Sequence, residues 1–241
     1  LLLVVTPSKA MRETARRIRE CQMPNSAFVL SCTKGMEIGT GLTMSEILRQ
    51  ELPLHRLGVL SGPSHAEEVA RNAPTAVVLA SHDASEAKSL QSLFSNRSFR
   101  TYTNTDVTGV ELGGALKNIY AIAAGVSDGL HLGDNTKAAL ITRALAEMVR
   151  IGEAAGGQPS TFYGLSGVGD LMVTCFSKHS RNRLVGERLG RGESLPEITA
   201  SMQMVAEGVP TTFSVAELAE NRGLDAPIVR CVKAILLGEL S

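Results

Sequence analysis

The chain has 241 residues, of which 44% are hydrophobic, enough for one large domain or two smaller ones with a packed core. Its 24 lysines and arginines balance its 24 aspartates and glutamates, so the net charge gives no indication of a nucleic acid or an acidic membrane surface as partner. The most apolar stretches are far too short to cross a bilayer, which argues against stable membrane insertion.

The four cysteines form no CxxC pair and no cluster with histidine at the spacing of zinc ligands. We therefore expect no metal site. Isolated cysteines are typical of reduced thiols, so we expect a cytoplasmic protein.

Up to about residue 105, short apolar runs alternate with amphipathic segments. Continuous apolar runs are typical of strands covered on both faces, and their alternation with helices predicts an α/β fold with a parallel, Rossmann-like sheet. The expected strands are 1–6, 27–32, 57–62, 75–81 and 99–103, and the expected helices are 9–20, 42–50, 64–72 and 84–94.

The chain opens on the apolar run LLLVVT, with no methionine and no basic segment before it. We interpret this run as a buried strand and not as a signal peptide. Because a natural protein seldom opens on a core strand, we expect that part of the N-terminus is missing from this chain.

The second half of the chain predicts an all-α domain. After about residue 106 the strand patterns stop, and glycine, proline, asparagine and aspartate separate helical patterns. Asp106 is expected to cap a long helix that includes 109–125. The further expected helices are 136–155, 180–189, 195–204, 210–221 and 227–237. The sequence therefore predicts a sheet domain over 1–105 and a helical domain over 106–241.

The expected helix GVELGGALKNIYAIAAG (109–125) carries two adjacent glycines and a lysine, Lys117, in an otherwise apolar stretch. The residues that share the helix face of Lys117 are all small: Gly113, Gly114, Ala121 and Ala124. We interpret this face as a shallow trough that lets a ligand approach the lysine, with the amide of Asn118 at its rim. The alternative is close helix–helix packing, with Lys117 reaching out to water.

Two more candidates follow expected strands, where open parallel sheets bind their ligands. Lys34 follows the second strand, although a solvated turn lysine is the alternative. Gly62 follows the third, and Ser64 with Glu67 is spaced as a capping box at a helix N-terminus that could accept an anion. We assign His65 to packing or to the surface.

The glycine-rich segment GLSGVGDL (164–171) is no dinucleotide loop, because no strand–helix unit surrounds it. We expect it to hold Asp170 through a bent backbone, or to be a flexible loop between helices. The segment KHSRNR (178–183) suits a phosphate, since it combines arginine with hydroxyl and amide groups at a helix start, although an ordinary solvated basic turn is the alternative. Its polar members are Lys178, His179, Ser180, Arg181, Asn182 and Arg183.

Several motifs together resemble the bacterial NAD(P)-dependent sn-glycerol-3-phosphate dehydrogenases. They occur in the family's order along the whole chain: TKG (33–35), SGPSHAEE (61–68), GGALKNIYAIAAG (113–125), NTKAALITRALAEM (135–148), GLSGVGDLMVTC (164–175), SRNR (180–183) and AEG (206–208). The resemblance implies reversible reduction of dihydroxyacetone phosphate with NADH or NADPH. It also implies a role in phospholipid synthesis and a cytoplasmic homodimer.

The resemblance further implies a role for each matching residue. Lys117 corresponds to the catalytic lysine. The implied substrate contacts are Lys34, Gly62, Ser64, Lys117, Asn118, Asp170, Ser180, Arg181 and Asn182, and the implied cofactor contacts are Lys34, Ala66, Arg181, Val205 and Glu207. A protonated lysine could stabilise the oxygen that gains charge when hydride adds to the ketone, and then protonate it. The small residues beside Lys117 would let nicotinamide and substrate approach.

The family's glycine fingerprint for dinucleotides is absent from this sequence, so the residues that separate NAD from NADP cannot be identified. If the molecule is this short, we expect weak cofactor binding and little activity, and if the missing segment is merely disordered or left out, we expect full activity. Two alternatives stay open. The chain could be a non-catalytic fragment, or a related dehydrogenase acting on another hydroxy acid or sugar acid.

Overall fold

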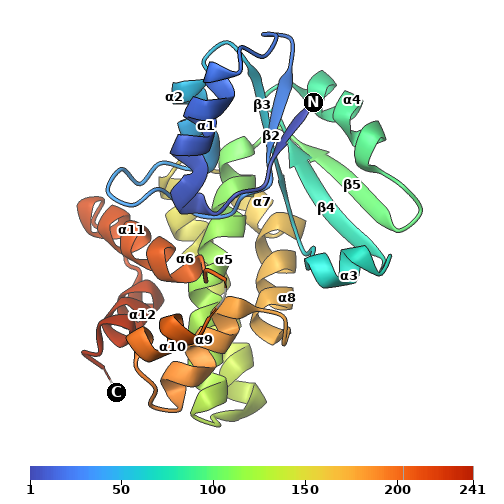
Figure 1. The fold of residues 1–241 in the computed structure, drawn as a ribbon. Helices are drawn as coiled ribbons and strands as arrows, with labels where there is room; N and C mark the ends of the chain where they lie inside the picture. The colour runs from blue at the N-terminus through green and yellow to red at the C-terminus, as the bar shows by residue number, and fades with distance from the viewer. Residues whose placement is uncertain (203, 241) are drawn as a thin grey trace.

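The computed structural model describes residues 1–202 and 204–240. Residues 1–104 form a five-stranded sheet in the order β1-β2-β3-β4-β5 with helices packed on it, and we call this part the sheet region. The strands are β1 (Leu2–Val4), β2 (Phe28–Ser31), β3 (Arg56–Ser61), β4 (Thr75–Ala80) and β5 (Phe99–Asn104). The rest of the described chain is helical, and we call residues 106–240 the helical region (Figure 1).

The sheet is mixed, so the expectation of a parallel sheet is wrong at one pairing. β1, β2 and β3 are parallel, β4 and β5 are parallel to each other, and β3 pairs with β4 in antiparallel fashion. The connection between β3 and β4 contains the short helix α3 (Ala66–Ala70), in which no residue is buried. A parallel crossover needs a connection that packs over the sheet. The five-residue α3 buries no side chain against the sheet, and the chain turns back after it to form β4 antiparallel to β3.

Helices cover both faces of the sheet. α1 (Met11–Glu20), which follows the short helix η1 (Ser8–Ala10), packs with α2 (Met44–Glu51) on one face. α4 (Ala84–Phe94) packs on the other. Side chains on one strand point alternately to the two faces. In β2, Val29 therefore packs with α1 and α2, and Leu30 packs with α4 on the opposite face.

Helix capping differs from the prediction at one site. Thr43 and Glu46, which were not predicted as a cap, form a capping box at the start of α2. The expected box at Ser64 and Glu67 does not form. His65 occupies the N-cap position of α3, and the Ser64 hydroxyl donates to the carbonyl oxygen of Gly62 at 3.1 Å.

The helical region is built around α5 (Val107–Gly129), with α6 (Gly133–Ala154) and α9 (Arg181–Gly190) beside it. The remaining helices are α7 (Pro159–Phe162), α8 (Asp170–Phe176), α10 (Leu195–Ser201), α11 (Gly208–Asn221) and α12 (Pro227–Leu237). The glycine-rich stretch expected as a bent loop is a π-helical turn, η2 (Leu165–Gly169), that leads into α8. Within the described residues, no helix has the length and apolar character needed to span a membrane.

The helix α5 joins the two regions (Figure 1). Asp106 caps it as expected, because its carboxylate accepts the N–H of Gly109 at 2.9 Å. Val107 and Val110 in the first turns pack against Val59 and Val78 of the sheet. Further along, α5 is buried among the other helices. One rigid element therefore fixes part of the sheet relative to the helical core.

The glycines of α5 allow backbone and side-chain atoms of other segments to approach closely, so the trough interpretation is wrong. A Cβ on Gly113 would lie 2.6 Å from the carbonyl oxygen of Ser166, and one on Gly114 would lie 2.5 Å from Ser61 Oγ. Ala121 and Ala124 are buried in the helical core. The small side chains next to Lys117 are therefore covered by protein atoms. The packing alternative explains the glycines, but Lys117 does not reach out to solvent.

Replacing Gly125 by alanine tests this packing. Its Cβ would overlap the carbonyl oxygen of Arg183, which is backbone of α9 and cannot move aside alone. We expect the free energy of unfolding, measured with urea, to fall by about 3 kcal/mol. Gly169→Ala is the matched control, because the nearest atom to its Cβ lies 3.7 Å away, and we expect a change within about 0.5 kcal/mol. Equal effects of the two substitutions would contradict this account.

Candidate active site

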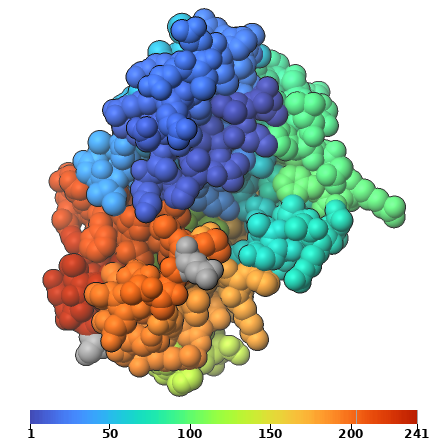
Figure 2. Space-filling model, in the orientation of Figure 1, coloured from blue at the N-terminus to red at the C-terminus, as the bar shows by residue number. Residues whose placement is uncertain are grey.

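A cleft of about 730 Å³ lies between the sheet region and the helical region. In Figure 2 the sheet region, coloured blue to green, lies against the orange and red part of the helical region. One wall follows the carboxyl ends of β1, β2 and β3, with residues such as Thr6, Lys34 and Ser64. The other wall comes from α5, α8, α9 and the segment before α11. Ligands bind at this edge of α/β sheets, so the cleft is the candidate active site.

A buried carboxylate at the cleft wall binds two lysines. Lys117 Nζ on α5 lies 2.5 Å from one oxygen of Asp170, and Lys34 Nζ lies 2.5 Å from the other. Asp170 is 1% exposed and Lys117 6% exposed. Lys34 also donates to the carbonyl oxygen of Gly62 at 3.1 Å. Since Lys34 belongs to the sheet region and Asp170 to the helical region, this cluster joins the two.

The same contacts set the ionisation of the cluster. Burial lowers the pKa of Lys117 from 10.5 to about 8, because the positive charge loses solvation, while Asp170 opposes the shift and Lys34 adds to it. Burial disfavours the charged form of Asp170, yet the two ammonium groups prevail and hold its pKa below 3.8. Lys117 can therefore lose and regain a proton near neutral pH beside a carboxylate that stays ionised.

Thr174 completes the surroundings of Lys117, and the sequence analysis missed it. Lys117 Nζ donates to Thr174 Oγ1 at 2.6 Å, and this hydroxyl donates to the backbone oxygen of Asp170 at 2.6 Å. Asp170 and Thr174 are four residues apart, on the same face of α8. That spacing was the available signal, and it has no meaning until the helix is known to start at Asp170.

Amide groups fix the next part of the wall. Asn182 Nδ2 donates to Asn118 Oδ1 at 2.9 Å, and Asn182 Oδ1 accepts the N–H of Gly208 at 2.8 Å. Ser180 caps α9 by accepting the N–H of Arg183 at 3.2 Å. These contacts hold α5, α9 and the start of α11 in one arrangement at the cleft.

The arginines of the predicted basic segment 178–183 lie in different surroundings in the folded chain. Arg181 lines the cleft and donates to the carbonyl oxygen of Val205 at 3.0 Å. Arg183 instead pairs with Asp128 and Glu187 and donates to the carbonyl oxygen of Ser177. It therefore holds the turn before α9, and does not line the cleft.

Most of the predicted site residues come together in the cleft. Its lining includes Lys34, Ser64, Ala66, Lys117, Asn118, Ser180, Arg181, Asn182, Val205 and Glu207. Gly62 and Asp170 lie behind it and bind Lys34. The carboxylate of Glu207 accepts hydrogen bonds from the N–H and the hydroxyl of Ser8.

Two histidines line the cleft, although His65 was expected to pack or to lie on the surface and His179 was named only as a member of the basic segment 178–183. His65 belongs to the sheet region and His179 to the helical region, and their ring centroids are 5.9 Å apart. Burial lowers the pKa of His65, and the charge of Lys117 adds to the effect. His65 is therefore neutral near pH 7.

The cleft fits the reactive end of a nicotinamide dinucleotide. It lies at the carboxyl ends of three parallel strands, and its volume is that of a typical cofactor or small-ligand site. Ala66, the first residue of α3, also lines the cleft.

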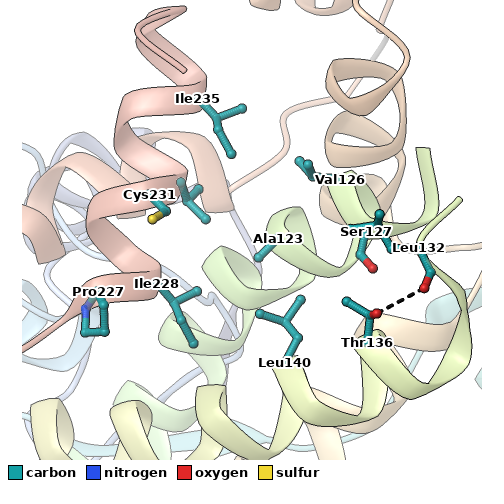
Figure 3. Close-up of a pocket in the computed structure, with 11 residues that line it drawn as sticks. Ala123, Val126, Ser127, Leu132, Thr136, Leu140, Pro227, Ile228, Cys231 and Ile235 are labelled. Carbon is teal, nitrogen blue, oxygen red and sulfur yellow. Dashed lines mark hydrogen bonds between the residues drawn. The ribbon is translucent and has the colours of Figure 1, made fainter. Parts of the chain in front are cut away.

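Figure 3 shows a second hollow, of about 310 Å³, between α5, α6 and α12. Its lining is apolar apart from the hydroxyls of Ser127 and Thr136 and the thiol of Cys231. A phosphomonoester carries close to two negative charges at neutral pH, about −1.5 to −2. This hollow therefore does not suit a phosphorylated substrate.

No group of three or more candidate metal ligands occurs among residues 1–202 and 204–240.

Comparison with known proteins assigns the sheet region and the helical region to two parts of one protein family. Residues 1–87 match the model of the N-terminal part of NAD-dependent glycerol-3-phosphate dehydrogenase, and residues 106–241 match the model of its C-terminal part. The fold and the cleft are those of a dehydrogenase with an α/β sheet and a helical region. The chain belongs to the NAD-dependent glycerol-3-phosphate dehydrogenase family.

Individual relatives agree with this assignment. The chain is 49% identical over 239 residues to glycerol-3-phosphate dehydrogenase [NAD(P)+] of Chlorobium limicola, covering 98% of this chain and 72% of the relative. It is 50% identical over 236 residues to the Moorella thermoacetica protein of the same name, covering 98% and 70%. The crystal structure of glycerol-3-phosphate dehydrogenase from Coxiella burnetii superposes with a TM-score of 0.94 at 41% identity, covering 99% of this chain and 73% of that one.

Replacing Asp170 by asparagine should strongly destabilise the protein, because two lysines then lose the carboxylate that they share. We expect a loss of about 3 kcal/mol in urea unfolding at pH 7. The contribution is complete at that pH, since a carboxylate with a lowered pKa stabilises the fold above its unfolded pKa and loses the effect on acidification.

The control is Asp225→Asn, which removes an exposed carboxylate paired with Arg150 and Arg230. We expect a loss below about 1 kcal/mol. Similar losses for the two variants would contradict the proposed importance of the buried cluster.

Proposed function

We propose that this chain catalyses the reversible reduction of dihydroxyacetone phosphate to sn-glycerol 3-phosphate with NADH or NADPH. The observation that carries the proposal is the buried cluster of Lys117, Asp170 and Lys34 at the wall of the cleft, in a chain that belongs to this family. When bound, the nicotinamide supplies the hydride. Residues 1–105 would hold the cofactor and residues 106–241 most of the substrate.

Lys117 is the proposed acid and base. As hydride reaches the carbonyl carbon, negative charge develops on the oxygen, and a protonated Nζ can stabilise it and give it a proton. In the reverse direction the neutral amine takes the proton from the alcohol. Asp170 and Thr174 hold Nζ through hydrogen bonds of 2.5 and 2.6 Å, which fixes its position at the cleft.

The other groups have proposed binding roles. Arg181 uses one N–H on Val205 and keeps others to bind the phosphate, together with the hydroxyl of Ser180 and the amides of Asn118 and Asn182. Lys34 contacts substrate and cofactor, with Gly62 and Ser64 beside it. Ala66, Val205 and Glu207 contact the cofactor.

Substituting Lys117 by methionine should abolish catalysis while leaving an apolar side chain in its place. We expect kcat to fall by about 10³-fold or more, measured by the absorbance of NADH with dihydroxyacetone phosphate. Lys88→Met is the control, because Lys88 is exposed on α4. Residual turnover within tenfold of the unsubstituted protein would exclude Lys117 as the acid. Saturable NADH binding without turnover on dihydroxyacetone phosphate, but with turnover on a 3-hydroxy acid, would favour the related dehydrogenase class.

The kcat/KM values for reduction and for oxidation should depend on pH in opposite ways. Reduction needs protonated Lys117, so its kcat/KM should fall as the pH rises through about 8. Oxidation needs the neutral amine, so its kcat/KM should rise over the same range. Initial rates from pH 6 to pH 10 test this expectation. Identical profiles in both directions would contradict it.

The proposal extends to assembly and location. We propose a homodimer, and the partly open apolar hollow of Figure 3 is a surface that a second copy could cover. We propose a cytoplasmic location and a supply of glycerol phosphate for phospholipid synthesis. All four cysteines are free in the structure, which supports a reducing compartment.

A further inference from the structure

Two glutamates of the helical region bind serines of the sheet region in the same way. Glu111 on α5 accepts the N–H of Ser45 at 2.9 Å and, through its other oxygen, the Ser45 hydroxyl. Glu207 before α11 accepts the N–H of Ser8 at 3.0 Å and the Ser8 hydroxyl. We call these contacts the two carboxylate–serine pairs.

The serines occupy equivalent places. Ser45 lies in the first turn of α2, and Ser8 is the first residue of η1, which leads into α1. N–H groups in a first helical turn have no partner within the helix and favour a carboxylate. At α2 the local cap is already supplied by Thr43 and Glu46. The contact of Glu111 therefore adds a connection between the two regions that the helix itself does not require.

The two pairs hold the part of the sheet region that carries Lys34. The helices α1 and α2 pack on the face of β1 and β2, and Lys34 lies in the connection between β2 and α2. Lys34 reaches Asp170 across the boundary between the two regions. Its neighbour Met36 also packs into the helical core. The position of α2 relative to α5 thus helps to decide whether Lys34 contacts Asp170.

We propose that Glu111 and Glu207 are positioning residues, which hold α1 and α2 against the helical region so that Lys34 stays on Asp170 beside Lys117. Glu111 is the clearer of the two, because it is 8% exposed and is not among the residues that line the cleft. Glu207 lines the cleft, so it can also contact a ligand.

The proposal has a consequence at Lys117. The charge of Lys34 helps to lower the pKa of Lys117. If α2 moves away and takes Lys34 with it, the pKa of Lys117 should rise. Burial raises the pKa of Glu111 to about 7, so Glu111 is mostly ionised where Lys117 titrates. The direct electrostatic effect of removing Glu111 therefore has the opposite sign, because loss of a negative charge disfavours the ammonium form of Lys117. The direction of the change therefore separates positioning from a simple charge effect.

The experiment measures the titration of the isotope-labelled Nζ of Lys117 by NMR in the protein without cofactor, together with amide hydrogen exchange at Ser45. Six variants are compared with the unsubstituted chain: Glu111→Ala, Glu111→Gln, Ser45→Ala, Glu217→Ala, Lys34→Met and the combination of Glu111→Ala with Lys34→Met. Glu217→Ala is the control, because this glutamate is exposed on α11. Glutamine keeps an acceptor for the N–H of Ser45, so it should rescue most of the effect of alanine.

For Glu111→Ala we expect an upward shift of the Lys117 midpoint and about a tenfold loss of protection at the Ser45 amide. Ser45→Ala should produce a smaller change in the same direction, and Glu217→Ala no change. Combining Glu111→Ala with Lys34→Met should give no further upward shift than Lys34→Met alone. A lowered or unchanged midpoint in Glu111→Ala, or unchanged exchange at Ser45, would overturn the proposal.

The inference rests on the proposed function only for its meaning in catalysis. Both measurements use protein without cofactor, so they report on the carboxylate–serine pairs even if turnover of dihydroxyacetone phosphate is not found. Failure of the proposed function and failure of this inference are therefore distinguishable.

Discussion

Two lysines share one buried carboxylate at the junction of the sheet region and the helical region, and the site depends on this arrangement. Burying a charge costs several kcal/mol unless a partner compensates it. Asp170 is almost fully buried, and it has compensation because Lys117 comes from its own region and Lys34 from the other. The charges are satisfied together only when the two regions are in contact. Association of the regions and assembly of the site are therefore one event.

The helix α5 makes that contact possible. Its first turns pack on the sheet, its middle carries Lys117, and its last turns pack against α9. Glycine costs helix stability, roughly 1 kcal/mol at each interior position. Here that cost is offset because backbones approach more closely than any side chain would allow, at Gly113 to the π-helical turn and at Gly125 to α9. Close approach at Gly113 places α8, and with it Asp170, next to Lys117.

The polar contacts around this cluster belong to several elements. Asn182 links Asn118 to the start of α11, and Arg183 holds the turn that leads into α9. Each contact orients a residue that lines the cleft or supports one that does. The result is a wall in which the acidic, basic and amide groups already have partners and defined positions before a ligand arrives. Such preorganisation is what stabilisation of a developing charge requires.

Much of the fold was predictable because it depends on local patterns. Apolar runs and amphipathic segments gave the five strands and most helices within a few residues, and Asp106 gave the start of α5. The direction of β4 was not predictable from its own residues, since an apolar strand pairs equally well either way. The segment before it contains a predicted helix, yet this helix, α3, buries no residue and does not cross over the sheet.

The candidate site, like the fold, was predictable only in part. The sequence alone supplied the residue types and, through the motifs of the family, most of the positions in the cleft. It did not supply the partners. The small face of α5 was interpreted as a space for ligands, whereas protein fills it. Thr174 was missed because its spacing from Asp170 has a meaning only once the start of α8 is known, and His65 was assigned to packing or to the surface although it lines the cleft.

Local sequence thus determined which segments become helices and strands, because periodicity and capping act over a few residues. Only the tertiary structure decided that Lys34, Lys117 and Asp170 meet. Lys34 and Asp170 are separated by 136 positions in the chain, and the free energy of a buried charge depends on which groups lie within a few ångströms in space.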